Sequence, residues 1–378
     1  MKNKIKLVCI YQVIMPYRIG VYERLGNNEF YEFELLHGKS EANSKKRNYE
    51  GEISFKASKL KSFYLPVKTN NGESSQQILP FLFFSLMKRN PDVILSEGAS
   101  GLINATMAFL YAKLFRKKYI WWSLGRLEGR QHKGLRAKID KWIHFIERHS
   151  DAIFTYSTQG ANHFIRNRGI PAKKIFVSVN VIDTEKKLNY ISSLKSHKNK
   201  EFHIVFVGAI IKVKRLEILI DAFNNLSKKY SNIYLDIIGD GDYADVIKRY
   251  LLITPNDRII MHGRKIGVEL SQMLMDSSVL VLPGLGGLAI CDGMLHSLPV
   301  ICGSADGTEL DLLDETCGFI TSTVTKNFLE NKLEYLITNP DVAEKMGKNS
   351  YTRITKEFPI SAYMENLYKC IDSVFNKL

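Results

Sequence analysis

Short apolar runs that end at a glycine and lead into a helical pattern recur through the second half of the chain. Residues 202–208 and 234–239 are two such runs, and residues 279–282 lead into a glycine-rich turn. Strands that alternate with helices pair in parallel, because each helix returns the chain to the same edge of the sheet. The pattern therefore predicts a doubly wound parallel sheet that binds its ligand beyond the carboxyl ends of the strands.

The first half repeats this scheme. Its strands are predicted at residues 5–11, 91–95, 119–122, 151–156 and 175–179. A chain of 378 residues suits two domains of ordinary size better than one core. We therefore predict two Rossmann-like α/β domains, over residues 1–185 and 201–358, with the ligand site in the cleft between their sheets. Residues 184–200 lack apolar periodicity and are predicted to be the linker.

Composition narrows the class of protein. Apolar residues make up 45% of the chain and charged residues 24%, as in folded globular proteins. The five cysteines form no CxxC pair, which argues against a zinc site and a disulfide framework and favours a reducing compartment. The basic and apolar start of the chain is too short for a signal peptide, and we interpret it as a strand. Residues 78–87 are too short for a membrane span and predict a core helix. We expect a cytoplasmic protein.

Positive charge is concentrated in one part of the chain, whose formal net charge is +14 in all. Residues 113–148 hold eleven Lys/Arg and three Asp/Glu, together with the three tryptophans, Trp121, Trp122 and Trp142. Basic side chains among aromatic rings suit an anionic membrane surface, and the competing interpretation is a solvated helix face. A nucleic-acid partner is not expected, because the sequence has no helix-turn-helix, zinc or RNP pattern.

Three glycines in four residues separate a predicted strand from a predicted helix. They are Gly284, Gly286 and Gly287. Amides at a helix start bind anions, and glycine lets a phosphate approach closely. Asp292 follows about one turn into the helix, where its carboxylate could accept hydrogen bonds from a ribose. The segment therefore predicts a nucleotide site, and the competing interpretation is a tight turn without a ligand.

Cations crowd the loop that follows the strand ending at Gly208. Lys212, Lys214 and Arg215 stand between that strand and the next predicted helix. Cations beside a strand end suit a diphosphate, whose charge must be stabilised when it leaves as a product. The competing interpretation is a solvated loop.

Two other patterns are weak. Asp240 and Asp242 spell Asp-x-Asp, which can bind a metal, but aspartate is also favoured in a turn that caps a helix. We interpret the match as accidental and expect no metal. The segment after the first strand lacks the GxGxxG fingerprint, which argues against a nicotinamide-dependent enzyme.

Together these segments resemble the retaining GT-B glycosyltransferases of family four, also called glycosyl transferases group 1. The C-terminal match rests on Gly208 with Lys214, the turn from Gly239 to Gly241, Gly263, and residues 283–300. In the first half, residues 16–18, 97–98 and 150–160 resemble bacterial polysaccharide-assembly members more loosely. The resemblance implies the GT-B fold, with a last helix over residues 359–378 that returns to the first domain.

The sequence departs from the family at three site positions. The family's sugar-contacting glutamate falls on Gly284, and its arginine after the first strand falls on Ala209. Its second glutamate falls on Asp292, which keeps the charge, and its lysine is kept as Lys214. The departures leave a second hypothesis open, a catalytically impaired binding or partner subunit. They also fit an enzyme with a different donor sugar.

The resemblance implies sugar transfer with retention from a UDP- or GDP-sugar, without a metal or other cofactor. The implied acceptor is a saccharide or a polyprenyl-diphosphate-linked sugar, in capsule, O-antigen or lipopolysaccharide synthesis at the inner face of the cell membrane. We expect Lys214 to neutralise the departing diphosphate, the amides of Gly287 and Leu288 to cradle it, and Asp292 to anchor the ribose.

The remaining site residues are implied more weakly. On the donor side they are Gly208, Lys212, Arg215, Gly263, Arg264 and Gly286. On the acceptor side they are Tyr17, Arg18, Gly125 and Arg126, which follow predicted strands of the first domain.

Overall fold

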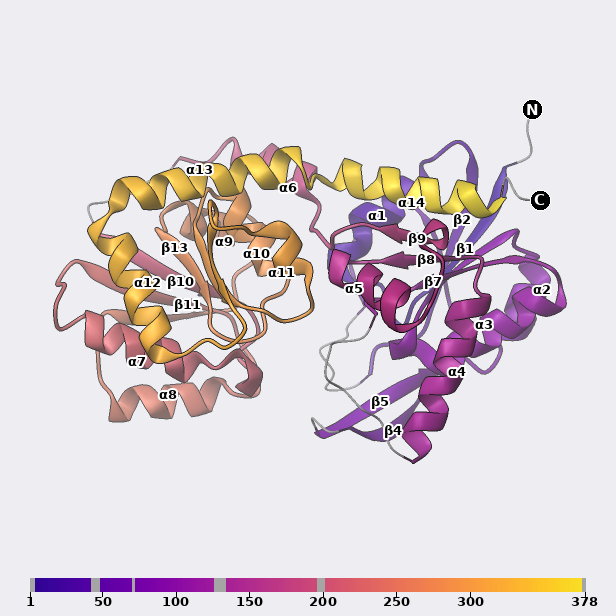
Figure 1. Ribbon diagram of the computed structural model, residues 1–378, viewed down its shortest axis with the longest axis horizontal. Coiled ribbons are helices and arrows are strands. Elements are labelled where there is room, and N and C mark those ends of the chain that lie inside the picture. The colour runs from indigo at the N-terminus through magenta and orange to yellow at the C-terminus, as the bar shows by residue number, and fades with distance from the viewer. Residues whose placement is uncertain (1–3, 42–47, 70–71, 126–133, 196–200, 376–378) are drawn as a thin grey trace. The chain divides into compact units, whose positions relative to one another are not determined.

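The protein folds into two compact units (Figure 1). The computed structural model describes residues 4–41, 48–69, 72–125, 134–195 and 201–375. The first unit comprises Met1–Val179 and Ser361–Leu378, and the second comprises Asn180–Ile360. The division thus falls before the expected linker and not within it.

The first unit is built on a parallel sheet of seven strands in the order β3-β2-β1-β6-β7-β8-β9. The strands are β1 (Ile5–Ile10), β2 (Tyr31–His37), β3 (Lys56–Lys59), β6 (Val93–Glu97), β7 (Lys118–Trp122), β8 (Ala152–Thr155) and β9 (Ile175–Val177). An antiparallel pair, β4 (Phe63–Thr69) and β5 (Gly72–Ile78), stands apart from this sheet. The predicted parallel sheet is confirmed.

Helices connect these strands and cover the sheet. The helical elements are η1 (Pro16–Arg18), α1 (Ile19–Gly26), α2 (Leu82–Arg89), η2 (Ala99–Gly101), α3 (Leu102–Leu114), α4 (Leu135–His149), α5 (Thr158–Asn162), η3 (His163–Asn167), η4 (Ala172–Lys174) and, from the far end of the chain, α14 (Ile360–Phe375). Trp121 and Trp122 of β7 are both fully buried. A central parallel strand is covered on both faces, so neither ring can contact a membrane, and that part of the expected membrane surface is wrong.

The second unit has a parallel sheet of six strands in the order β12-β11-β10-β13-β14-β15. The strands are β10 (Phe202–Val207), β11 (Ile233–Ile238), β12 (Ile259–Gly263), β13 (Val279–Leu282), β14 (Val300–Gly303) and β15 (Gly318–Thr321). The strand order reverses between β10 and β13, and in doubly wound sheets ligands bind beyond the strand ends at such a reversal.

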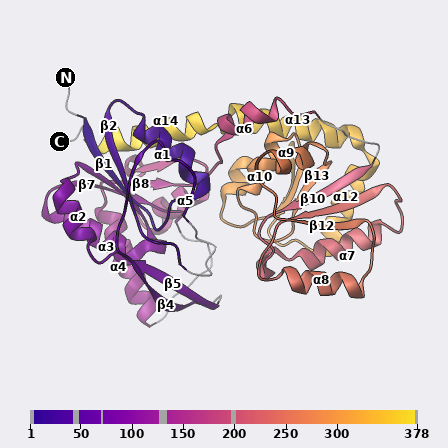
Figure 2. The same ribbon diagram turned by 180° about the vertical axis from the view of Figure 1, so that it is seen from behind.

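The helical elements of this unit include a pair that pack together, α7 and α12, which lie side by side in Figure 2. The elements are α6 (Thr184–Ile191), η5 (Lys212–Lys214), α7 (Leu216–Leu226), α8 (Ala244–Ile253), α9 (Gly267–Met275), α10 (Ala289–Leu295), α11 (Thr308–Leu312), α12 (Lys326–Thr338) and α13 (Pro340–Lys356).

The expected linker over residues 184–200 is wrong in its first part, where α6 forms. The Asp183 carboxylate accepts a hydrogen bond from the Lys186 amide at 3.1 Å and caps the helix. The Thr184 hydroxyl accepts one from the Ile360 amide at 2.9 Å, which holds the helix against the end of the unit. Helix α6 is therefore stabilised by its N-cap and by a tertiary hydrogen bond, although its sequence lacks apolar periodicity. Residues 196–200 lie outside the described residues.

The expected core helix over residues 78–87 is also partly wrong. Ile78 ends β5, and α2 begins only at Leu82. Leu82 and Leu86 are buried, but Phe81, Phe84 and Met87 are exposed. Within the described residues, no helix is both long and apolar enough to span a membrane.

Candidate functional site

Three glycines mark the carboxyl ends of neighbouring strands in the second unit. Gly208 follows β10, Gly239 follows β11, and Gly263 ends β12. The Gly208 amide donates to the Ile238 carbonyl at 3.0 Å, and the Gly239 amide donates to the Gly263 carbonyl at 2.8 Å. A Cβ on Gly239 would lie 1.8 Å from the Gly208 carbonyl oxygen, so only glycine fits there. The three glycines carry no side chains that would cover the backbone, so a ligand can approach the strand ends closely.

Lys214 joins two loops at this edge, which we call the lysine loop (residues 209–215) and the glycine loop (residues 284–287). Its ammonium donates hydrogen bonds to the carbonyl oxygens of Leu285 and of Gly286, the latter at 2.5 Å. The Leu285 amide in turn donates to the Val213 carbonyl at 3.3 Å. Lys214 is therefore a cation placed directly beside the glycine loop.

Gly284 stands where the family that this sequence resembles has a glutamate, and the packing around it accounts for the difference. A Cβ at this position would lie 2.1 Å from the Val213 carbonyl oxygen and 2.7 Å from the Lys214 Cα. The two loops therefore touch backbone to backbone, and no side chain fits between them. The glycine is a requirement of this loop packing, and a glutamate could enter only if the lysine loop moved.

The glycine loop leads into α10. Gly287 has a φ of 117°, in the region that favours glycine. The amides of Ile290 and Cys291 already donate to the carbonyls of Gly287 and Leu288. The amides before them are the ones that a helix start leaves without an intrahelical acceptor. Leu288 is the N-cap of α10, so its amide, which the sequence predicts to face a phosphate, is one of these. The Gly287 amide, the other amide predicted to face a phosphate, precedes the helix.

Asp292 has an ion-pair partner that the sequence does not indicate. Its carboxylate pairs with the Lys187 ammonium of α6, and its side chain is 13% exposed. Lys187 lies in the segment that the sequence predicts to be linker, so the pattern of residues gives no sign of this partner. Beside this pair, burial lowers the pKa of His296, whose Nδ1 lies 2.7 Å from the Asp292 carbonyl oxygen. The neutral imidazole of His296 and the ammonium of Lys187 thus lie on either side of Asp292, which is predicted to bind the ribose. The Asp292 carboxylate still has lone pairs that can accept a hydrogen bond from a ribose hydroxyl.

The other predicted donor residues lie at the same edge of the sheet. Lys212 and Arg264 are exposed, and Arg215 adopts a left-handed conformation (φ 55°) as it begins α7. The Asp240 carboxylate accepts a hydrogen bond from the Gly241 amide at 2.8 Å. This is the turn-forming role expected for Asp240.

On the predicted acceptor side, Arg18 is not at the surface. It is 1% exposed, and its guanidinium lies 4.6 Å from the Trp122 ring and 4.9 Å from the Tyr156 ring. Its Nη1 donates to the Tyr363 hydroxyl at 2.9 Å. A cation enclosed in this way holds the unit together and cannot reach a bound acceptor, so the expected acceptor contact of Arg18 needs correction.

The other residues predicted to contact the acceptor are Tyr17, Gly125 and Arg126, and the surroundings of Tyr17 and Gly125 differ from those of Arg18. Tyr17 is half-buried, with its hydroxyl 3.5 Å from that of Tyr11. Gly125 has a φ of 84°, and a Cβ there would lie 3.2 Å from the Gly160 Cα. Arg126 lies outside the described residues.

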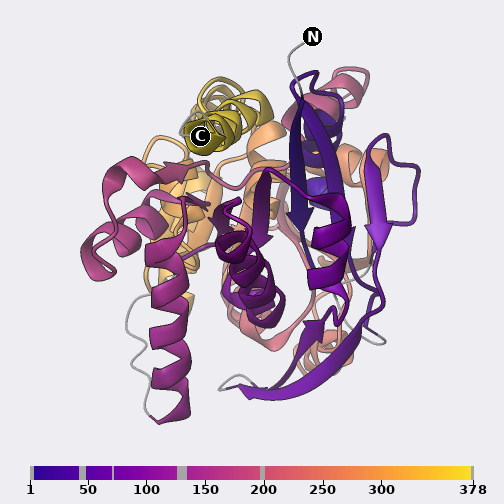
Figure 3. The same cartoon turned by 90° about the vertical axis from the view of Figure 1, so that its right-hand side faces the viewer.

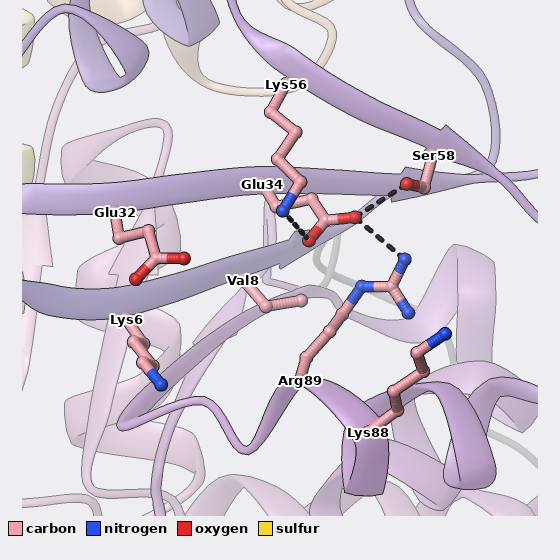
Figure 4. A pocket seen from close by; sticks show the side chains of 8 residues that line it. All are labelled: Lys6, Val8, Glu32, Glu34, Lys56, Ser58, Lys88 and Arg89. Carbon is pink, nitrogen blue, oxygen red and sulfur yellow. Dashed lines mark hydrogen bonds and ion pairs between the residues drawn. The ribbon is translucent and has the colours of Figure 1, made fainter.

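The first unit also has a charged pocket of about 450 Å³ (Figure 4). It is lined by Lys6, Val8, Glu32, Glu34, Lys56, Ser58, Lys88 and Arg89. Glu34 accepts from Arg89 at 2.7 Å, Ser58 at 2.6 Å and Lys56 at 3.2 Å. Burial alone would raise the pKa of Glu34, but these hydrogen bonds outweigh it and lower the pKa. The pairing ties β2 to β3 and α2, and we interpret the pocket as structural.

The comparison with protein families points to the second unit. Residues 191–353 match the family model of Glycosyl transferases group 1. An uncharacterised glycosyltransferase of Methanocaldococcus jannaschii is 28% identical over 178 residues, which cover 46% of this chain and 48% of that protein. The capsular polysaccharide biosynthesis glycosyltransferase CapM of Staphylococcus aureus is 27% identical over 190 residues, 48% of each chain. The chain thus spans about half the length of these curated relatives.

Similarity of structure extends over the whole chain. The crystal structure of Anabaena HepE in complex with UDP and glucose has a TM-score of 0.71 to this protein at 13% identity. It covers 98% of this chain and 100% of that one. At so low an identity the likeness speaks for the fold alone. The fold is GT-B, with two Rossmann-like units.

Proposed function

We propose that the protein is a glycosyltransferase that moves a sugar from a nucleoside-diphosphate sugar to a saccharide or lipid-linked acceptor. The observation that carries the proposal is the Lys214 ammonium, held on carbonyls of the glycine loop inside the segment that matches the family model. A cation fixed beside the glycine loop at the start of α10 suits a departing diphosphate. The UDP bound by HepE makes UDP the first nucleotide to test.

Each residue has a separate task in this proposal. Lys214 leaves the carbonyls and binds the diphosphate, whose charge grows as the sugar leaves. The amides of Gly287 and Leu288 bind the same phosphates, and Asp292 binds the ribose beside Lys187. Lys212, Arg215 and Arg264 add positive charge at the edge. The chain then supplies positioning and charge stabilisation, and transfer proceeds with retention and without a metal.

The acceptor is proposed by analogy. The name of the Staphylococcus aureus relative places it in capsular polysaccharide synthesis, and a surface polysaccharide or its lipid-linked precursor is the corresponding acceptor class here. The enzyme would then act in the cytoplasm or at the inner face of the cell membrane.

A donor screen tests the proposal. Thermal unfolding is followed with UDP, GDP and CMP, and saturation to 100 times Kd should stabilise the nucleotide-binding unit by about 2.7 kcal/mol. Stabilisation by one nucleoside diphosphate supports the donor site. If none of the three changes the melting temperature, the protein is the impaired partner subunit and the proposal fails.

Lys214→Met then tests the mechanism. The variant keeps the aliphatic stem and loses the charge, so kcat should fall by about 100-fold or more. Lys228→Met, at an exposed position beyond the end of α7, is the matched control and should leave kcat unchanged. Equal turnover of the Lys214 variant and the parent would remove Lys214 from the mechanism. Comparison of the anomeric configuration of the product with that of the donor sugar decides whether transfer proceeds with retention.

A further inference from the structure

The outer faces of α2, α3 and α4 expose an unusual number of large apolar side chains. The three helices lie next to one another on one side of the first unit, facing the viewer in Figure 3. The exposed side chains are Phe81, Phe84 and Met87 at α2, Leu110, Leu114 and Phe115 at α3, and Ile139, Trp142 and Phe145 in α4. A large apolar surface of this kind on one side of a unit marks an interaction site.

Aromatic contacts join the three helices into one surface. Phe83 of α2 contacts Tyr111 and Phe115 at the end of α3, with ring centroids 5.6 and 6.2 Å apart. Phe109 of α3 contacts Phe145 of α4 at 6.1 Å, and Trp142 stacks on Phe145 at 5.3 Å. One group of packed rings therefore ties α2 to α3, and a second ties α3 to α4.

The same surface is positively charged. Residues 81–90 and 102–118 contain no aspartate or glutamate. The two acidic residues of α4, Asp140 and Glu147, both pair with Arg168, at 2.7 and 3.2 Å. The exposed cations are Lys88, Lys113, Arg116, Lys138, Lys141 and Arg148, of which Lys113 pairs with Asp151 at 3.4 Å. In α4, Lys138, Lys141 and Trp142 follow one another at helical spacing, so cations and apolar groups share one face.

We propose that the outer faces of α2, α3 and α4 form a docking surface for an anionic lipid bilayer, the lipid-facing surface. Apolar side chains enter the acyl boundary, while the lysines and arginines meet acidic headgroups. A tryptophan with its ring at the surface suits the interface, and Trp142 anchors its indole by donating to the Thr106 hydroxyl at 3.0 Å. The surface replaces the one expected around Trp121 and Trp122, which are core residues.

A lipid bilayer fits these observations better than a nucleic acid. Phosphate recognition needs the cations but gives no role to exposed Leu114, Met87 or Phe84, whose aliphatic and aromatic groups gain free energy only when they leave water. A bilayer uses both kinds of side chain at once.

Flotation of the full chain with vesicles tests the proposal. The protein should float with phosphatidylcholine vesicles that contain phosphatidylglycerol and stay behind with pure phosphatidylcholine. Lys138→Glu with Lys141→Glu should lower partitioning by at least about tenfold, because each cation near an anionic surface contributes about fivefold. Phe84→Asp with Leu114→Asp should lower it similarly. These two side chains are 67% and 69% exposed, so the fold should tolerate the change.

Matched controls lie in the second unit. Leu252→Asp with Ile253→Asp changes two apolar side chains of α8 that are 80% and 79% exposed. Lys228→Glu with Lys248→Glu reverses two exposed lysines. Both control pairs should float like the parent. If the control variants lost as much vesicle binding as the test variants, the effect would come from overall net charge or hydropathy and not from this surface. That result would overturn the proposal.

Trp142 provides a direct reading of insertion, because Trp121 and Trp122 are buried and Trp142 is 36% exposed. Anionic vesicles should shift the tryptophan emission to the blue, and brominated lipid should quench it. In Trp142→Phe the protein should still float while both signals disappear. Flotation of the parent without quenching, or binding to single-stranded RNA without binding to vesicles, would overturn the proposal.

The lipid-facing surface does not depend on the donor site. The surface variants should transfer sugar to a water-soluble acceptor as the parent does, so the two proposals fail separately.

Discussion

At the scale of single residues, Gly284 sets the distance between the lysine loop and the glycine loop. The Val213 carbonyl and the Lys214 Cα occupy the space where its side chain would stand. This close approach lets the Lys214 ammonium reach the carbonyls of Leu285 and Gly286. The missing glutamate and the retained lysine are therefore parts of one local arrangement.

The consequence can be measured with Gly284→Ala. The new methyl group forces the loops apart, and overpacking of this kind costs about 1–3 kcal/mol in the free energy of unfolding. Gly286→Ala is the matched control in the same loop, because its Cβ would meet only the flexible Ile290 side chain, at 3.2 Å. Thermal unfolding should show a clear loss for the first variant and a small one for the second. Equal melting temperatures would mean that the loops do not pack as described.

The sequence could predict the positions of such residues but not their contacts. The spacing of glycines located the glycine loop, and the lysine loop followed from its cluster of cations. The partner of Asp292 could not be found this way, because Lys187 lies 105 residues away in a segment without periodicity. The aspartate N-cap Asp183 was the one local signal that could have indicated α6.

At the scale of elements, three neighbouring strands of the second unit are joined by one aspartate. Asp236 of β11 bonds His203 of β10 at 2.7 Å and His262 of β12 at 2.6 Å. Hydrogen bonding to Asp236 raises the pKa of His203. Burial opposes ionisation of Asp236, but the bonds to His203 and His262 outweigh it and lower its pKa.

Stability of the second unit should depend on pH through this cluster. Because the folded pKa of His203 is raised, its contribution is complete below the unfolded value of about 6.5 and disappears as the pH rises through the folded value. Because the pKa of Asp236 is lowered, its contribution is complete above about pH 3.9 and disappears as the pH falls through the folded value. The cluster therefore stabilises most between these two limits.

Asp236→Asn isolates the effect, because it keeps the shape and removes the charge. The difference in melting temperature between parent and variant should be largest near pH 5.5 and should shrink toward pH 8.5. A difference that stays constant over this range would show that His203 does not become charged in the folded protein.

At the scale of the whole molecule, the alternation of strands and helices predicted both parallel sheets, because it is repeated in most of the connections between their strands. The surface of the first unit could not be predicted in the same way. Periodicity cannot tell a helix face that packs from one that stays exposed, and α2 therefore appeared to be a core helix. The charge of residues 113–148 can be counted in the sequence, but the division of its tryptophans between the core and the surface cannot.

The first unit is completed by the far end of the chain. Helix α14 contacts it through the bond from Arg18 to the Tyr363 hydroxyl, which joins residues 345 positions apart. Burial raises the pKa of Tyr363 to about 12, so the phenol stays neutral and can accept this bond at physiological pH. A second phenol of α14, Tyr368, donates to the Arg24 carbonyl at 3.1 Å in a partly buried position.

The two phenols allow a matched comparison of how strongly α14 is held. Tyr363→Phe removes an acceptor from a buried guanidinium, and the loss of a hydrogen bond to a charged group costs about 1.5–3 kcal/mol in the free energy of unfolding. Tyr368→Phe removes a bond between neutral groups, which costs about 0.5–1.5 kcal/mol. Chemical denaturation should therefore place the Tyr363 variant below the Tyr368 variant. The opposite order would mean that the aromatic rings around Arg18 hold its charge without the phenol.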